Sequence, residues 1–200
     1  MAKKGIKSDK GENKKEEQKK GFIWNVPNAL TLSRLVFTFI LIYLILFGYP
    51  ENFMLVGVLF VIAAVTDWFD GFFARKLNQK SELGARLDQV IDRVFMIPII
   101  IVLLYKFYSI DQNLAFLLAA CLSREIVGTP GLVIRMIRNT DAYRVKYIGK
   151  VVTFVQSIAI ILIIFRFDNV IYFWITVLAA IATGLLGIIA GFDYLRDSLK

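Results

Sequence analysis

Apolar residues form long, nearly continuous runs after about residue 20, and short polar links separate these runs. Several runs approach the roughly 20 residues that a helix needs to cross the hydrocarbon core of a bilayer. The segment 22–31 is shorter and amphipathic, and we expect it to form an N-terminal helix that lies along the membrane interface and leads into the first span. The pattern therefore predicts an all-α integral membrane protein with six transmembrane helices, at residues 33–47, 53–76, 83–107, 113–137, 145–165 and 170–195.

The composition agrees with a membrane protein. Hydrophobic residues make up 58% of the chain, and its mean hydropathy is +0.64. A soluble domain with a large core is the alternative, but apolar runs recur along most of the chain, as at 96–105 and 151–165. This recurrence favours a polytopic membrane protein.

The first 20 residues differ from the rest of the chain. They contain eight lysines, four acidic residues and almost no apolar residues, so they cannot bury enough surface to fold. We expect residues 1–20 to be a disordered cytoplasmic tail and residues 21–200 to be the membrane-embedded domain. The formal charge of +8 then indicates contact with anionic lipid and no nucleic-acid partner.

The charges of the links predict the orientation of the helices. Glu51, Asp111 and Asp168 mark alternate links that are short and poor in cations. By the positive-inside rule, the basic links and both termini face the cytoplasm of a multi-pass protein in the cell membrane. The basic links contain Arg75, Lys76, Lys80 and Arg86, and Arg135, Arg138, Arg144, Lys146 and Lys150.

Cysteine and histidine usage limits the possible chemistry. The chain has no histidine, and its single cysteine, Cys121, lies in an apolar run. Disulfides, thiolate clusters and imidazole ligands or bases are therefore excluded. Any metal site must be built from oxygen ligands.

Four aspartates are the candidate ligands. Asp67 and Asp70 are three residues apart near the end of one predicted helix, and Asp88 and Asp92 are four residues apart near the start of the next. Each pair therefore shares one face of its helix, and the two faces can converge near the cytoplasmic side. Such carboxylates would repel one another without cations and suit a site for two divalent ions, such as Mg²⁺ or Mn²⁺.

Small residues beside the aspartates indicate a ligand slot. Gly71 and Ala74 follow the first pair, and Gly84 precedes the second. Ordinary packing of small residues between membrane helices is the alternative. The aspartates also have alternatives, either as salt-bridge partners of nearby arginines or as part of a divalent-cation transporter. Arg75 argues against a cation pathway, because it would repel the cation.

These residues form the pattern D-x-x-D-G-x-x-A-R, eight residues, G-x-x-x-D-x-x-x-D. The pattern resembles the signature of the CDP-alcohol phosphatidyltransferase family, and the resemblance extends over residues 22–197. Members join a phosphatidyl group from CDP-diacylglycerol to an alcohol and release CMP. The fixed positions of the signature are Asp67, Asp70, Gly71, Ala74, Arg75, Gly84, Asp88 and Asp92.

The resemblance implies roles for these residues in a helical bundle of the CDP-alcohol phosphotransferase type. Asp67, Asp70 and Asp88 are expected to bind the two metal ions. Asp92 is expected to be the last metal ligand and the catalytic base. The expected CDP-binding residues are Gly71, Ala74, Arg75 and Gly84.

The acceptor alcohol is less closely defined. Residues 25–34 and Ser123-Arg124-Glu125 are similar to segments of phosphatidylglycerophosphate and cardiolipin synthases. This similarity predicts that glycerol-3-phosphate is the acceptor, with phosphatidylglycerol as the alternative. The family motif G-K-x-K-T is incomplete here, because Val152 replaces the second lysine. The candidate acceptor-binding residues are Arg124, Arg135, Arg144 and Lys150, with Lys146 as a further cation.

Two other interpretations stay open. Arg124 could instead form a salt bridge with Glu125 or with a carboxylate of the metal site. The resemblance also implies a homodimer, and Gly184, Gly187 and Gly191 could pack one helix closely on another. Spacings of three and four residues serve contacts within one chain equally well.

Overall fold

The computed structural model describes residues 26–76, 82–137 and 147–198, and within these ranges every regular element is an α-helix. Side chains are described for a smaller set, mainly residues 33–66, 89–131 and 151–192. The predicted tail, residues 1–20, lies outside the described residues. The helices are α2 (Val26–Gly48), α3 (Phe53–Lys76), α4 (Glu82–Ile110), α5 (Gln112–Ile137), α6 (Tyr147–Phe165) and α7 (Val170–Ser198).

The observed helices confirm the order and extent of the predicted ones. The bounds of α3 coincide with the prediction, and the other bounds differ by a few residues except at the start of α2. There, residues 26–31 of the expected interfacial segment belong to α2, so a separate helix ending at residue 31 is wrong. Pro27 does not interrupt this helix, because the N–H that proline lacks has no intrahelical partner in the first turn.

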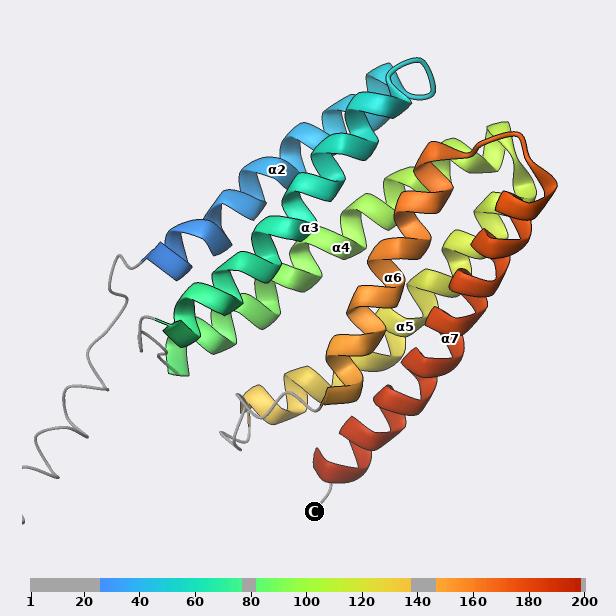
Figure 1. Ribbon diagram of the computed structural model, residues 1–200. Helices are drawn as coiled ribbons and strands as arrows, with labels where there is room; N and C mark the ends of the chain where they lie inside the picture. Colours follow the sequence, from blue (N-terminus) through green and yellow to red (C-terminus); the bar gives the residue numbers. More distant parts are fainter. Residues whose placement is uncertain (1–25, 77–81, 138–146, 199–200) are drawn as a thin grey trace, which may run out of the picture.

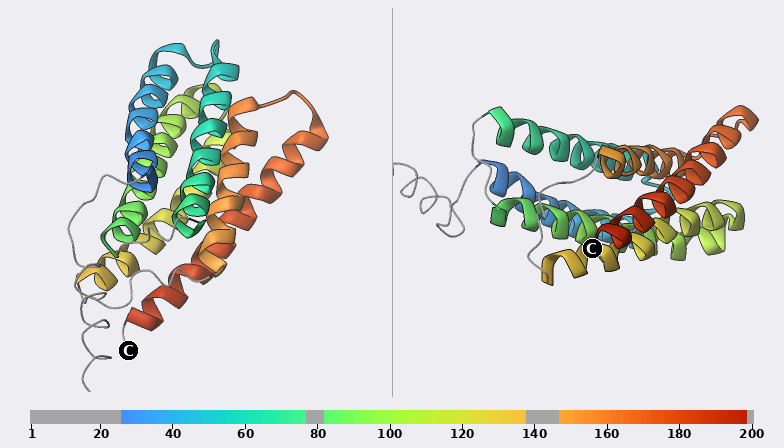
Figure 2. Two further views of the ribbon diagram at one scale, coloured as in Figure 1. Left: turned by 60° about the vertical axis from the view of Figure 1, so that its left-hand side comes forward. Right: turned by 90° about the horizontal axis from the view of Figure 1, so that it is seen from below.

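The six helices run alternately up and down the bundle (Figure 1). Helix α2 packs against α3 and α4, α4 packs against α5, and α7 packs against α5 and α6. Helix α3 ends and α4 begins at one end of the bundle, which we call the aspartate end, and α5 also ends there. The turns α2–α3, α4–α5 and α6–α7 lie at the opposite end, the turn end, and Figure 2 shows the same arrangement from two other sides.

Aromatic and branched side chains fill the space between α2, α3 and α4. Phe60 of α3 and Phe95 of α4 stack with ring centroids 5.6 Å apart, and both are almost fully buried. Tyr49, in the turn after α2, connects this core to α6 because its hydroxyl donates to the Ile164 carbonyl at 3.1 Å. Burial raises the pKa of Tyr49 to about 12, so the hydroxyl stays protonated and keeps this hydrogen bond.

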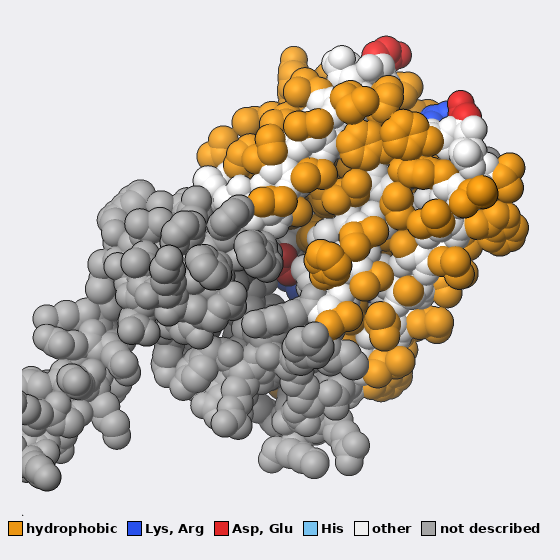
Figure 3. Space-filling model, viewed as in Figure 1, with side chains coloured by type: hydrophobic (Ala, Val, Ile, Leu, Met, Phe, Trp, Pro, Cys, Tyr) orange, Lys and Arg blue, Asp and Glu red, His pale blue; other side chains and the backbone are white. Residues whose placement is uncertain are grey.

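The outward surface of the described helices is also apolar. Phe39, Phe47 and Phe116 are each more than 70% exposed, and Figure 3 shows apolar side chains over much of the described part of one face. Large exposed apolar surfaces are uncommon on soluble monomers. Two stretches, Gln112–Gly131 and Val170–Phe192, are long and apolar enough to cross a membrane, while those in α2, α3 and α6 are shorter.

Hydroxyl groups inside these helices bond to their own backbone. Thr38, Thr66 and Thr176 each donate to the carbonyl four residues earlier, at 2.7 to 2.9 Å. This arrangement satisfies a hydroxyl without water or a partner from another helix. It suits side chains in an apolar environment.

The described charged side chains fall at two levels along the bundle. Between these levels every described helix has an uncharged stretch, and in α7 it covers residues 170–192. Glu51, Lys106, Asp111, Arg166 and Asp168 lie near the turn end, whereas Arg34, Asp92, Arg93, Arg124 and Glu125 lie toward the aspartate end.

The stacked pair in the core gives a stability prediction. Replacing Phe60 with Ala should lower the free energy of unfolding by about 3 to 5 kcal/mol, because it leaves a cavity against Phe95. Thermal unfolding in detergent micelles measures the change. Phe39→Ala is the matched control, since this ring is 72% exposed; an equal loss of stability in the two variants would contradict the assigned core.

Candidate functional site

The backbone places the four candidate aspartates on two helices, one ending and the other beginning at the aspartate end. Asp67 and Asp70 lie in the last three turns of α3, and Asp88 and Asp92 lie in the first three turns of α4. Because all four are in helical segments, each pair shares one helix face, as predicted. Only residues 77–81 separate the two helices, and both helix ends lie at the same end of the bundle (Figure 1).

Several predicted site residues lie on described helices but outside the described side chains. For these residues the structure therefore shows the helical backbone and not the side chain. They are Asp67, Asp70, Gly71, Ala74, Arg75, Gly84, Asp88, Arg135 and Lys150. Arg144 and Lys146 lie outside the described residues altogether.

Asp92 is the one predicted metal ligand whose side chain is described. It is half-buried on α4, one residue before Arg93. Among the described residues no hydrogen-bond donor or cation is paired with its carboxylate. The side chain therefore has the capacity to bind a cation or accept a proton at this end of the bundle.

Arg124, a predicted acceptor-binding residue, lies buried between α5 and α6. Its Nη1 group donates to Glu125 and to the Gln156 side-chain oxygen, and its Nη2 group donates to the Thr153 hydroxyl at 2.6 Å. The ion pair with Glu125 is the alternative that the sequence left open, and it is present. Hydrogen bonds from two helices fix the orientation of this guanidinium.

Glu125 is shared between two arginines. It is 1% exposed, and its two carboxylate oxygens accept from Arg93 of α4 and from Arg124. A buried carboxylate needs such pairing, because removing a charge from water is costly. The shared carboxylate therefore joins α4 to α5, and Arg93 follows Asp92 directly on α4.

Sequence reasoning missed part of this cluster. Arg93 was among the nearby arginines considered as salt-bridge partners of the aspartates, with no other predicted role, and Gln156 was not singled out. Gln156 is fully buried, and its amide nitrogen donates to the Cys121 carbonyl at 3.3 Å. The available signal was an amide in the otherwise apolar run 151–165, because a polar side chain there requires a partner.

Arg34 is a second buried cation, and the sequence predicted no functional role for it. It lies on α2, is 1% exposed and is the largest fully buried side chain in the described part of the chain. The sequence marked it only as the end of the segment 25–34. Its position on α2 places it among the charges toward the aspartate end.

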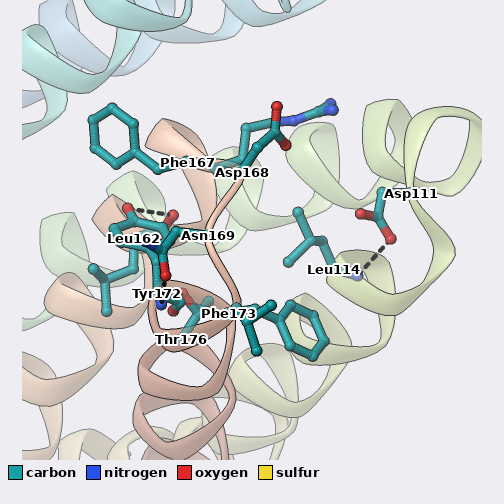
Figure 4. Close-up of a pocket in the computed structure, with 11 residues that line it drawn as sticks. Asp111, Leu114, Leu162, Phe167, Asp168, Asn169, Tyr172, Phe173 and Thr176 are labelled. Atoms are coloured by element: carbon teal, nitrogen blue, oxygen red, sulfur yellow. Dashed lines mark hydrogen bonds between the residues drawn. The ribbon is translucent and has the colours of Figure 1, made fainter.

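A cavity of about 330 Å³ lies at the turn end, between the α4–α5 turn and the α6–α7 loop (Figure 4). Two of the polar side chains that line this cavity cap the starts of helices. Asp111 accepts from the backbone N–H groups of Asn113 and Leu114 at the start of α5, and Asn169 accepts from that of Ile171 at the start of α7. These are helix N-caps. The cavity lies far from the aspartates and is not the candidate site.

Comparison with known proteins agrees with the signature. The chain matches the family model for CDP-alcohol phosphatidyltransferase over residues 24–186. It is 31% identical to a CDP-diacylglycerol–glycerol-3-phosphate 3-phosphatidyltransferase of Blochmanniella floridana, over 80% of this chain and 82% of that protein. Proteins of the same name from Wigglesworthia glossinidia brevipalpis (30% identical, 85% and 92% covered) and Pectobacterium atrosepticum (34%, 74% and 81%) are also similar. The chain therefore belongs to the CDP-alcohol phosphatidyltransferase family.

Proposed function

We propose that this protein transfers the phosphatidyl group of CDP-diacylglycerol to glycerol-3-phosphate, releasing CMP and forming phosphatidylglycerophosphate. The names of its relatives support this reaction. The observation that carries the proposal is the buried cluster in which Arg93 of α4 and Arg124 of α5 share the Glu125 carboxylate, with Arg93 next to Asp92 along α4. Guanidinium groups held beside an acidic metal site suit an anionic acceptor.

Two Mg²⁺ or Mn²⁺ ions would be held by Asp67, Asp70, Asp88 and Asp92. The donor set fits such ions, because all four proposed ligands are carboxylates on helical segments at the same end of the bundle. When bound, the ions supply stabilisation of the negative charge that develops on the phosphoryl oxygens. Gly71, Ala74, Arg75 and Gly84 would bind the CDP part of the donor.

Asp92 would act as the base for the acceptor. It takes the proton of the acceptor hydroxyl, whose oxygen attacks the phosphorus atom that carries diacylglycerol. A new P–O bond forms to the acceptor, and the bond between this phosphorus and the bridging oxygen breaks. CMP leaves with that oxygen.

Arg124 would bind the phosphate of glycerol-3-phosphate. Arg124 shares the Glu125 carboxylate with Arg93, and hydrogen bonds to Thr153 and Gln156 hold its guanidinium in place. An incoming phosphate dianion would therefore meet a cation whose geometry is already fixed. Arg135, Arg144 and Lys150 are the proposed additional cations.

Phosphatidylglycerol is the second candidate acceptor, giving cardiolipin. The absence of a lysine at Val152 favours it, since a phosphodiester needs fewer cations than a phosphate monoester. Family membership makes divalent-cation transport the weaker alternative. Uptake of Mg²⁺ by vesicles that contain the protein would support transport.

We further propose that all six helices cross the cell membrane, with both termini and the aspartate end on the cytoplasmic side. The uncharged stretches between the two levels of charge and the apolar outward surface support this placement. A homodimer remains a proposal that rests on family resemblance.

An acceptor panel tests the proposed reaction. Purified protein with CDP-diacylglycerol and Mg²⁺ should release CMP with glycerol-3-phosphate, and much less with phosphatidylglycerol or inositol phosphate. Removal of divalent ions with EDTA should abolish release, and Mg²⁺ or Mn²⁺ should restore it. Release with phosphatidylglycerol alone would establish the second candidate, and no release with any acceptor would refute the enzyme.

Replacing Asp92 with Asn should lower kcat by about 10²- to 10⁴-fold, because the amide cannot accept the acceptor proton. Binding of CDP-diacylglycerol should be largely retained, as measured by equilibrium titration. Asp168→Asn, at the exposed turn end, is the control and should keep full activity. Normal turnover in Asp92→Asn would exclude Asp92 as the base.

Glu125→Ala should destabilise the fold by about 3 to 5 kcal/mol, because it leaves two arginines without their shared carboxylate. Thermal unfolding in micelles measures the loss. Glu51→Ala removes an exposed carboxylate at the turn end and should have little effect. Equal unfolding midpoints for both variants would show that the cluster does not contribute to stability.

A further inference from the structure

We propose that Gly187 of α7 is a positioning residue for Arg124, so that α7 sets the affinity for the anionic acceptor. The inference rests on the proposed function, because it assigns Arg124 to the acceptor. Among the residues assigned a role in the reaction, α7 contributes none. Its influence would act through the stem of Arg124.

The contact between Gly187 and Arg124 is unusually close. A Cβ atom added at Gly187 would lie 2.3 Å from Cγ and 2.4 Å from Cβ of Arg124, and 3.1 Å from its Cα. Real Cβ atoms do not approach other atoms so closely, and one of the contacted atoms belongs to the backbone. Any side chain at position 187 must therefore separate α7 from α5 or displace the stem of Arg124.

The guanidinium end of Arg124 cannot easily move away from Gly187. Its guanidinium is bonded to Glu125 of α5 and to Thr153 and Gln156 of α6. Gly187 completes this enclosure from α7, which packs along α5 (Figures 1 and 2). Hydrogen bonds thus hold the guanidinium on one side, and on the other side the lack of a side chain at Gly187 leaves room for the stem of Arg124.

A second arginine of the cluster is accommodated in a similar way. A Cβ atom at Gly128 of α5 would lie 3.2 Å from the Nη2 atom of Arg93. Each arginine that binds Glu125 therefore lies against a glycine of a neighbouring helix. This repetition indicates that these glycines make room for the charged cluster in addition to bringing helix backbones together.

The other glycines of α7 allow a role in positioning Arg124 to be distinguished from a role in helix packing alone. A Cβ atom at Gly191 would lie 2.4 Å from Cγ1 of Val127, so that glycine also needs its close approach, but to an apolar side chain. A Cβ atom at Gly184 would meet the Ala120 carbonyl oxygen at 3.6 Å, an ordinary contact. All three glycines face α5 of the same chain, so they pack α7 against α5 within one chain.

The experiment compares three alanine variants of the full-length protein, Gly184→Ala, Gly187→Ala and Gly191→Ala, in the CMP-release assay. We expect Gly187→Ala to raise the KM for glycerol-3-phosphate about tenfold. Its KM for CDP-diacylglycerol should change less than about twofold, because the predicted CDP-binding residues lie on α3 and α4. Gly191→Ala should lower thermal stability without this selective change, and Gly184→Ala should resemble the original protein.

Gln156→Leu provides a second test that does not overpack the helices. It removes one hydrogen bond that orients Arg124 and should also raise the KM for glycerol-3-phosphate selectively, even if Gly187→Ala does not fold. An unchanged acceptor KM in Gln156→Leu, or equal effects of Gly187→Ala and Gly191→Ala on both substrates, would overturn the inference. Absence of CMP release by the original protein would refute the proposed function instead.

Discussion

The pairing of two arginines with the buried Glu125 is the constraint on which the packing of α4, α5 and α6 depends. One buried carboxylate holds two arginines from different helices, and a third helix completes the hydrogen bonding through Thr153 and Gln156. In an apolar bundle such a cluster tolerates little rearrangement, because each unpaired charge would cost several kcal/mol. The cluster therefore fixes α4, α5 and α6 relative to one another at the level of Asp92.

The helices could be predicted because their signals are local. Long apolar runs and the polar turn at residues 49–52 defined α3 to within its observed bounds, and the remaining helices to within a few residues apart from the start of α2. The first turn of α2 was the exception. The amphipathic character of residues 22–31 suggested a separate segment there, whereas residues 26–31 belong to α2, and a proline in the first helical turn removes no hydrogen bond.

The helix faces of the aspartates could be predicted because the two residues of each pair are close in sequence. The spacing of Asp67 with Asp70 and of Asp88 with Asp92 is enough to place each pair on one helix face. The partners of Arg124 are different, because Gln156 lies 32 residues away and the choice depends on which helices are neighbours. Packing over the whole bundle determines which helices are neighbours, so the pairing of Arg93 with Glu125 could not be predicted from sequence.

The close packing of α7 on α5 also bears on how the protein is made. Helix α7 follows the other described helices along the chain, so it emerges from the ribosome after them. The helices with the aspartates are synthesised earlier, whereas the enclosure of Arg124 is completed only when Gly187 reaches α5. During biosynthesis, the helices that carry the aspartates can therefore pack before α7 arrives, and the surroundings of Arg124 are complete only with α7 in place.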